Sequence, residues 1–347
     1  MVITTGTEHR CLVQARRLHG DTAGPVVHVV TEPRAFCEPI GMTDDVLCLH
    51  TDQDAPRGKV VSADLASIES GGTAGWAEVI PERGDALEQA HRAGRGFLGV
   101  YLHDARNRVL LFDAAGAELG ELALGDGISV SEVHVAEGSG ERFLGVQSFV
   151  RGSRAYRVDL SAVRASPLTL TGWPAPVPAV TMERRLAASA DGTAVPYFLL
   201  RLAGAGPALP ALLCGYGGFS IAITPRFNPA WLAWLAAGGA LAVANLRGGG
   251  EYGREWHEAG RRERKQNVYD DFIAVGEHLI STGVTTQGQL VLHGASGGGL
   301  LVGAVMTQRP DLAAVALPMV AVMDMLRFHP ARTPRGHRLP GDADPHR

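Results

Sequence analysis

The sequence contains little lysine, little cysteine and no long apolar run, and each shortage excludes a class of protein. Lysine occurs only at Lys59 and Lys265, so nearly all of the 32 basic residues are arginine, which indicates a bias of the coding DNA rather than a functional basic surface. The 36 acidic residues outnumber the 32 basic ones and give a net charge of −4. We therefore expect no nucleic acid and no anionic membrane as a partner. No apolar run approaches the ~20 residues that cross a bilayer.

The cysteines and the N-terminus indicate an intracellular protein. Cys11, Cys37, Cys48 and Cys214 are too few for a disulfide framework and show no Cys-x-x-Cys spacing, so we expect a reducing compartment. We predict neither a metal site nor a cofactor. Residues 1–10 lack the charged and apolar regions of a secretory signal peptide. The protein is therefore predicted to be cytoplasmic.

The first half of the chain is predicted to consist of β-strands. Short apolar stretches recur about every dozen residues and are separated by turn-forming residues. The predicted strands are Val26–Val30, Val46–His50, Lys59–Ala63, Trp76–Ile80, Phe97–Leu102, Arg108–Asp113, Glu118–Leu124, Glu132–Val135, Arg142–Phe149 and Ala155–Leu160. A sandwich, a barrel or a propeller fits this pattern. Strands that end in aspartate favour propeller blades, about three to four in number, which is too few for a closed ring of the usual size.

The second half has a different pattern. Prolines cluster between Ser166 and Val180 and predict a domain crossover, because such a stretch cannot sit inside a sheet or a helix. Beyond it, strands alternating with helices predict a parallel, doubly wound sheet. The predicted strands are Tyr197–Leu202, Ala211–Gly215, Ala240–Leu246, Leu290–Leu292 and Ala313–Val322, and the predicted helices are Gln266–Ser281 and Leu300–Met306. Phe328–Arg347 has almost no apolar residue and is predicted to be disordered.

One segment organises the second half. Gly294–Gly298 reads Gly-Ala-Ser-Gly-Gly and matches G-x-S-x-G, the nucleophile elbow of α/β-hydrolases, between a predicted strand and a predicted helix. A serine at such a turn takes strained backbone angles, and glycine neighbours let strand, helix and substrate approach each other. Ser296 is therefore a candidate nucleophile, and the N-terminus of the helix can stabilise an oxyanion. The alternative is a tight turn with an incidental serine.

Two further glycine-rich segments follow predicted strands. Cys214–Phe219 either forms an oxyanion-hole loop to which Tyr216 lends its hydroxyl, or is a turn around a packed tyrosine. Arg247–Gly253 contains G-x-G-x-x-G, which binds dinucleotides when a strand precedes it and a helix follows. The residues after it do not form an apolar helix, which disfavours that function. His257 among them is interpreted as a surface or packing residue rather than a base.

A nucleophilic serine needs a base, and the base needs an orienting acid. In α/β-hydrolases both follow the serine in the chain. The histidines after Ser296 are His329, His337 and His346, and the acids are Asp311, Asp324, Asp342 and Asp344. Asp324 follows a predicted strand, as a triad acid can, but no histidine has a further strand to hold it. We therefore expect an incomplete triad.

Many segments, in order between Val46 and His329, resemble the prolyl oligopeptidase family of serine peptidases. They are Leu49–Asp52, Tyr101–Asp104, Gly215–Phe219, Ile223–Pro225, Asn245–Gly253, Lys265–Asn267, Asp270–Phe272, Gly294–Gly298, Gln308–Leu312 and Met323–Met325. The resemblance implies a β-propeller that caps an α/β-hydrolase domain and admits short peptides, which are cut after proline. So many segments in the right order are far more specific than any single motif.

Position by position, the resemblance implies a role for each site residue. Ser296 is similar to the nucleophile, the Tyr216 hydroxyl and the Gly297 backbone N–H are similar to the oxyanion hole, and Phe219 and Val322 are similar to part of the pocket for the proline ring. Gly297 stands where the family usually has asparagine, but a backbone donor survives that change. The family's first blades, and its triad aspartate and histidine beyond residue 329, have no counterpart here. We hypothesise that residues 330–347 are an out-of-frame reading.

We therefore predict a truncated member of this family. Residues 1–172 are predicted to form a partial β-propeller, residues 173–329 an incomplete α/β-hydrolase domain, and residues 330–347 a disordered tail. The predicted activity is that of a serine endopeptidase for short proline-containing peptides, weak or absent in this chain because the triad is incomplete. The alternatives are a non-catalytic peptide-binding module on a dead hydrolase scaffold, and an esterase or acylaminoacyl peptidase of the same broad class. Open sheet edges predict low solubility or association.

Overall fold

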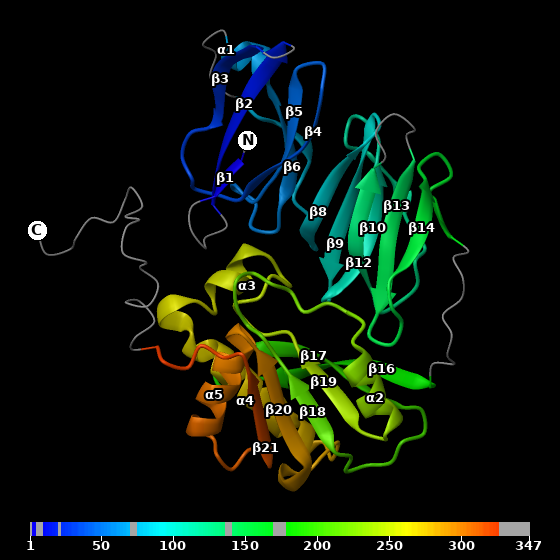
Figure 1. The fold of residues 1–347 in the computed structure, drawn as a ribbon, viewed down its shortest axis with the longest axis vertical. Helices are drawn as coiled ribbons and strands as arrows, with labels where there is room; N and C mark the ends of the chain where they lie inside the picture. The colour runs from blue at the N-terminus through cyan, green and yellow to red at the C-terminus, as the bar shows by residue number, and fades with distance from the viewer. Residues whose placement is uncertain are drawn as a thin grey trace, which may run out of the picture.

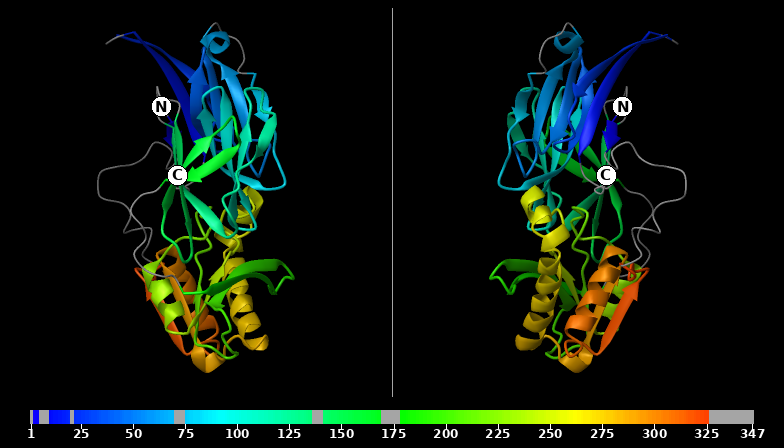
Figure 2. Two further views of the ribbon diagram at one scale, coloured as in Figure 1. Left: turned by 90° about the vertical axis from the view of Figure 1, so that its right-hand side faces the viewer. Right: turned by 90° about the vertical axis from the view of Figure 1, so that its left-hand side faces the viewer.

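The computed structural model describes residues 2–4, 10–19, 22–69, 75–135, 141–168 and 178–325. These residues form two parts at opposite ends of the long axis of the molecule (Figure 1). Antiparallel sheets fill one end, and a six-stranded mixed sheet with its helices fills the other, as the two side views in Figure 2 also show. No helix among the described residues is long and apolar enough to cross a membrane.

The first part consists of antiparallel sheets in which neighbouring strands follow one another in the chain. Its elements are β1 (Val2–Thr4), β2 (Cys11–His19), β3 (Thr22–Val30), β4 (Cys37–Thr43), β5 (Val46–Thr51), β6 (Lys59–Asp64), α1 (Leu65–Glu69), β7 (Ala77–Ile80), β8 (Ala86–Ala93), β9 (Gly96–His103), β10 (Arg106–Phe112), β11 (Glu118–Glu121), β12 (Ile128–Val135), β13 (Arg142–Ser148), β14 (Arg154–Asp159) and β15 (Arg164–Pro167). Strands β4–β7, β8–β11 and β12–β15 form four-stranded sheets, and β1–β3 form a three-stranded sheet. This is the partial propeller that the sequence predicts, and the sheets are its blades.

Apolar side chains from adjacent blades form shared cores. Leu49 of β5 belongs to a core with residues of β2 and β3, and Phe97 of β9 to a core with Val60 of β6. Leu111 of β10 and Leu144 of β13 belong to a third. Each blade therefore buries its faces against the next one along the chain, as in a propeller.

The second part is a mixed sheet with the strand order β16-β17-β19-β18-β20-β21. Its elements are β16 (Val180–Ala188), β17 (Ala194–Leu202), β18 (Ala211–Cys214), α2 (Pro229–Ala236), β19 (Ala240–Ala244), α3 (Arg254–Glu258), the 3₁₀ turn Arg262–Arg264, α4 (Gln266–Ser281), the 3₁₀ turn Gln287–Gln289, β20 (Leu290–Ala295), α5 (Gly297–Gln308) and β21 (Val315–Met319). Strands β18–β21 are parallel, whereas β16 and β17 form an antiparallel hairpin that pairs with β19. The prediction of a parallel sheet is thus wrong for β17, predicted as Tyr197–Leu202, which pairs antiparallel with β19 and, through a short turn, with β16, a strand that was not predicted.

The two faces of this sheet pack against different partners. Tyr197 of β17 lies in a core with Phe272 of α4 and Leu301 of α5. The next residue, Phe198, points to the opposite face, as alternation along a strand requires. There it packs against Phe149 of the propeller with ring centroids 5.4 Å apart. The propeller therefore covers part of one face of the six-stranded sheet, which we call the hydrolase sheet.

Hydrogen bonds and an ion pair also join the two parts. The Ser129 hydroxyl of β12 donates to the carbonyl of Pro225 over 2.7 Å, and the Arg254 N–H donates to the carbonyl of Pro56 over 2.7 Å. Asp104, in the β9–β10 turn, pairs with Arg184 of β16 at 2.7 Å. Pro225 and Arg254 lie on the segments that follow β18 and β19, so the blades cover the carboxyl ends of these strands.

Every strand predicted for the first half is present, but several others were missed. Strand β8 carries charged residues between its apolar ones, and β4 contains Pro39 and a bulge next to it, so neither shows a clear apolar alternation. The view that the proline-rich stretch avoids any sheet is wrong at Pro167, which ends the outermost strand of a blade, where a missing N–H is tolerated. The rest of that stretch at 169–177, His329 and the predicted tail at 330–347 lie outside the described residues.

Candidate active site

The predicted elbow is a sharp turn between β20 and α5. Ser296 has φ 55° and ψ −116°, which is a strained conformation for a residue with a side chain. Its N–H donates to the carbonyl of Met319 over 3.0 Å, which ties the turn to the end of β21. The residue is exposed at the carboxyl end of the parallel strands, where ligands bind in open α/β sheets. The geometry is that of a nucleophile elbow.

The glycines around Ser296 are required by close backbone approach. A Cβ at Gly294 would lie 2.2 Å from the carbonyl oxygen of Gly298, and one at Gly298 would lie 2.5 Å from the carbonyl oxygen of Gly215. A Cβ at Gly299 would lie 2.6 Å from the Cβ of Ala321. The helix can therefore begin beneath the serine only because these positions lack side chains.

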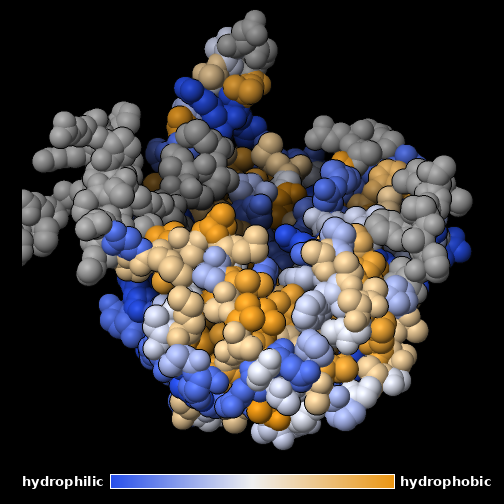
Figure 3. Space-filling model, turned by 60° about the horizontal axis from the view of Figure 1, so that its bottom comes forward, coloured by the Kyte–Doolittle hydropathy of each residue, from blue (hydrophilic) through white to orange (hydrophobic). Residues whose placement is uncertain are grey.

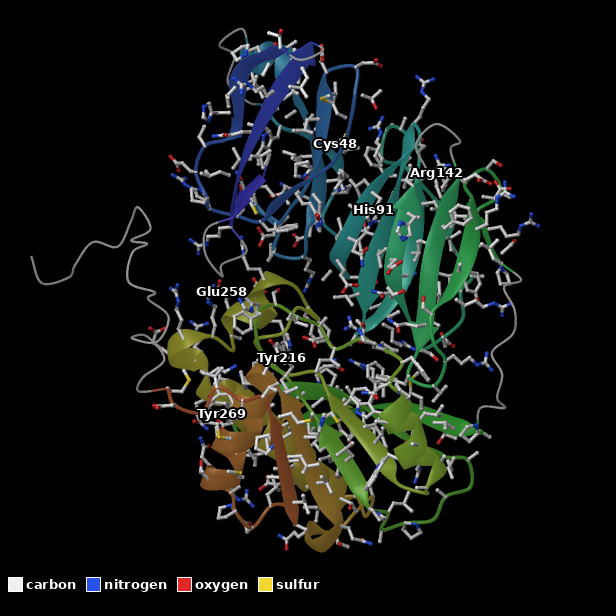
Figure 4. The ribbon with its side chains drawn as sticks, in the orientation of Figure 1. Cys48, His91, Arg142, Tyr216, Glu258 and Tyr269 are labelled. Carbon is white, nitrogen blue, oxygen red and sulfur yellow. The ribbon has the colours of Figure 1, made fainter. Side chains whose placement is uncertain are left out.

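The structure brings Tyr216 and Gly297 together. Tyr216 follows β18 and lies at the end of the sheet that faces the blades (Figure 4). A Cβ built on Gly297 would lie 3.5 Å from the Tyr216 hydroxyl oxygen. The N–H of Gly297 is in the first turn of α5, where helical N–H groups have no partner within the helix. A hydroxyl and a backbone N–H thus flank the position next to Ser296, although their role as an oxyanion hole stays a prediction.

Phe219 and Val322 lie at this end of the sheet on different segments. Phe219 is 51% exposed, and its ring centroid is 6.4 Å from that of Tyr216. Val322 is 39% exposed and follows Ala321, which approaches Gly299 at the start of α5. Both side chains are therefore accessible to a ligand beside the elbow, and their assignment to a proline pocket stays a prediction.

No side chain of the described residues is hydrogen-bonded to the Ser296 hydroxyl. The nearest histidine along the chain, His293, has one ring nitrogen 3.5 Å from the Cys214 sulfur and the other 3.3 Å from the Met319 sulfur, and burial lowers its pKa. Asp311 follows α5 at the end opposite to Ser296, about 18 Å along the helix axis, so it cannot orient a base at this serine. Asp324 is exposed beyond β21. His329, His337, His346, Asp342 and Asp344 lie outside the described residues.

His257 contacts backbone rather than a reacting group. Its Nδ1 is 3.1 Å from the N–H of Ser220 and 2.8 Å from the carbonyl of Gly248. It also lines a cavity of about 500 Å³ between the two parts of the molecule, with Asp52 and Glu88 from the blades and Arg254 from the hydrolase part. Ser220, the residue after Phe219, also lines this cavity, whereas Ser296, Tyr216 and Gly297 do not.

Sequence reasoning missed a buried charge network behind the site. Arg247, 4% exposed, binds the fully buried Asp271 of α4 with 2.6 Å between Nη2 and Oδ1. It also binds Asp191 and the Ser189 hydroxyl, and the Arg247 hydrogen bond holds the pKa of the Asp191 carboxyl well below its usual range. In the sequence Arg247 begins the glycine-rich segment and also lies in the family-like segment Asn245–Gly253, neither of which indicates an ion pair. The signal for its role was the position of Asp270–Phe272 among the family-like segments.

Comparisons with known proteins cover most of the chain. Residues 5–171 match the family model described as the N-terminal β-propeller domain of prolyl oligopeptidase, and residues 225–342 match the model of the prolyl oligopeptidase family. The second match extends beyond His329, so the expectation that the resemblance ends there is wrong for residues 330–342. A prolyl endopeptidase of Elizabethkingia miricola is 33% identical over 295 residues, which are 84% of this chain and 41% of that protein.

Solved structures give the same result. A structure from a study of two prolyl endopeptidases is 41% identical, with a TM-score of 0.70 over 95% of this chain and 48% of that one. Prolyl oligopeptidase B of Galerina marginata, bound to a 25mer macrocyclization substrate, is 29% identical, with a TM-score of 0.85 over 93% of this chain and 46% of that one. The chain thus spans less than half the length of the relatives it matches.

Proposed function

The chain belongs to the prolyl oligopeptidase family, and on that premise we propose that Ser296 is the nucleophile of a site that cleaves short peptides after proline. The observation that carries the proposal is the strained turn at Ser296, with the Tyr216 hydroxyl beside Gly297. We further propose that residues 1–172 act as the propeller cap and that residues 173–329 carry the chemistry, with residues 330–347 outside both domains.

In the proposed reaction the Ser296 Oγ attacks the carbonyl carbon of the residue that precedes the scissile bond. The carbonyl oxygen becomes an oxyanion, which accepts hydrogen bonds from the Tyr216 hydroxyl and the Gly297 N–H. Collapse of the tetrahedral intermediate, with the proton from Ser296 passed by the base to the leaving nitrogen, expels the amine and leaves an acyl-enzyme, which water then hydrolyses. Phe219 and Val322 offer apolar surface for the proline ring of the substrate.

The proton of Ser296 must go to a general base, and a base is the missing part of the described site. Without it the oxyanion hole and substrate binding alone leave only residual catalysis. We therefore propose that this chain by itself hydrolyses peptides weakly or not at all. The same observation favours the second candidate function, a peptide-binding module that has lost catalysis.

Hydrolysis of a blocked Gly-Pro fluorogenic peptide by the purified chain, beside Ser296→Ala, tests these proposals. Labelling of Ser296 with a fluorophosphonate reports on the nucleophile without a substrate. We expect slow labelling that disappears in Ser296→Ala, and turnover too weak to distinguish the two proteins. Turnover that requires Ser296 would show that a base reaches it. No labelling of a folded sample, together with binding of the peptide, would favour the binding module.

A further inference from the structure

The loop that carries Tyr216 and Phe219 connects β18 to α2 and is strained. Phe219 and Ser220 are consecutive residues with side chains, and both have positive φ, at 54° and 55°. Such conformations persist only where the surroundings hold them. We name residues Gly215–Ile223 the oxyanion loop, because it carries the proposed hydroxyl donor.

Lys265 holds the first half of the oxyanion loop. Its Nζ, half-buried just before α4, donates to the carbonyl of Gly217 over 2.6 Å. A Cβ on the next residue, Gly218, would lie 3.8 Å from this Nζ and 3.9 Å from the Tyr216 ring, so the ammonium group lies on the side of the loop that carries Tyr216. Gly217 itself presses on the first turn of α4, because a Cβ there would lie 2.2 Å from Val268.

Glu251 holds the other end of the loop. Its Oε1 accepts hydrogen bonds from the N–H of Ile223 over 3.0 Å and from the Asn245 side chain over 3.2 Å. The same Asn245 amide donates to the carbonyl of Ile223 over 2.8 Å, so both backbone polar groups of Ile223 are engaged. Glu251 and Asn245 are each only 1% exposed. This end of the loop is therefore fixed by a carboxylate that is removed from water.

We propose that Lys265 and Glu251 are positioning residues, which hold the oxyanion loop at both ends so that the Tyr216 hydroxyl stays beside Gly297. The role assigned to Tyr216 rests on the proposed function. The order of the loop does not, since it can be measured without any reaction.

Each group holds the loop most strongly when it is charged. The pH range in which Lys265 and Glu251 are charged at the same time is narrow. Burial lowers the pKa of Lys265 to about 8. Burial raises the pKa of Glu251 to about 7, and the nearby Glu88 of β8 adds to the shift. Tyr252 is the neighbour of Glu251, Tyr216 lies on the Lys265 side, and the His257 ring contacts the N–H of Ser220 within the loop. The loop is thus held at both ends by charge-assisted hydrogen bonds between about pH 7 and pH 8.

These charges cost folding free energy rather than supply it. A lowered lysine pKa means that the Lys265 contribution to stability is complete above the ordinary value of 10.5 and is lost as the pH falls through about 8. A raised carboxyl pKa means that the Glu251 contribution is complete below 4.5 and is lost as the pH rises through about 7. Removal of either charge is therefore expected to loosen the loop without lowering the stability of the protein. If the two groups served only to stabilise the fold, removing either charge would lower that stability.

Hydrogen–deuterium exchange of the whole chain at pH 7.5 tests the proposal with Lys265→Met, Lys265→Arg and Glu251→Gln. Lys59→Met is the matched control, since Lys59 is the other lysine of the chain and pairs with Glu78 in a blade. We expect Lys265→Met to speed exchange in residues 215–223 by about ten- to a hundredfold, the factor for losing one charge-assisted hydrogen bond. Lys265→Arg restores part of the protection, and Lys59→Met changes nothing there.

The pH profile gives a second measurement. After correction for intrinsic rates, protection of the loop in the wild type should fall below about pH 7, and Glu251→Gln should abolish that fall. Fluorophosphonate labelling of Ser296 should follow the same profile. Unchanged loop exchange in both Lys265→Met and Glu251→Gln would overturn the proposal. A different outcome separates the two proposals. If the variants change hydrogen exchange of the loop while wild-type Ser296 is not labelled, the proposed function is overturned, and the positioning role of Lys265 and Glu251 is still supported.

Discussion

The propeller blades and the hydrolase sheet are both built from strands, but they place their polar groups differently. The blades follow the chain in order, and their ion pairs are at the surface, as with Arg108 and Glu121, each about 40% exposed. In the hydrolase part, strands far apart in the sequence become neighbours, and charges such as Asp271 and Glu251 are buried where their segments meet. The part that carries the candidate site is thus the part in which charged side chains are buried.

The largest difference between the two parts is expected for Arg247→Met compared with Arg108→Met. Loss of Arg247 leaves Asp271 fully buried without its cation, which costs about 3–5 kcal/mol. Loss of Arg108, whose side chain is 40% exposed, costs about 0–1 kcal/mol. Urea unfolding followed by circular dichroism measures both. Equal losses would mean that the burial of charge does not distinguish the two parts.

A smaller difference is expected in the response of the two parts to pH. In the blades, burial lowers the pKa of His50 to about 4, so its contribution to stability is complete above 6.5 and is lost as the pH falls through about 4. In the hydrolase part, the raised pKa of Glu251 makes its contribution disappear as the pH rises through about 7. Lowering the pH should therefore destabilise the blades when His50 becomes protonated and stabilise the hydrolase part when Glu251 becomes protonated.

Melting temperatures between pH 4 and pH 8.5 test this opposition. Glu251→Gln should stabilise the protein at pH 8 by on the order of 1–3 kcal/mol and change little at pH 5. His50→Gln should instead reduce the loss of stability near pH 4. Destabilisation by Glu251→Gln at pH 8 would contradict the assignment of a buried, costly carboxylate.

The same contrast explains what the sequence could reveal. Blade strands such as β5 and β9 show apolar stretches between turn residues, so local pattern located them. Ser296 was located because the elbow is a local turn with a local motif. The contact of Lys265 with Gly217 spans 48 residues, and that of Arg247 with Asp191 spans 56, and no periodicity encodes such contacts. A single sequence therefore predicted the turn that carries the candidate nucleophile Ser296 but not the groups that hold its surroundings.

The smallest effect on stability is expected at β21, the last strand of the sheet among the described residues. Val315, Leu317 and Met319 are 44%, 44% and 52% exposed on one side of it, and apolar side chains are visible on the surface of this end of the molecule in Figure 3. An exposed apolar edge strand invites pairing with another chain. Leu317→Lys should therefore reduce self-association and change stability by less than about 0.5 kcal/mol.

Leu18→Lys is the matched control for this last experiment, because Leu18 is 72% exposed on β2 in the blades. Sedimentation velocity at several protein concentrations measures association of the wild type and both variants. If β21 is the contact surface, Leu317→Lys shifts the chain toward the monomer and Leu18→Lys does not. A wild type that remains monomeric at all concentrations would show that exposed apolar strands alone do not make this sheet associate. An equal shift in both variants would show that added charge, rather than the position of the strand, controls association, because each substitution adds one positive charge to a chain of net charge −4.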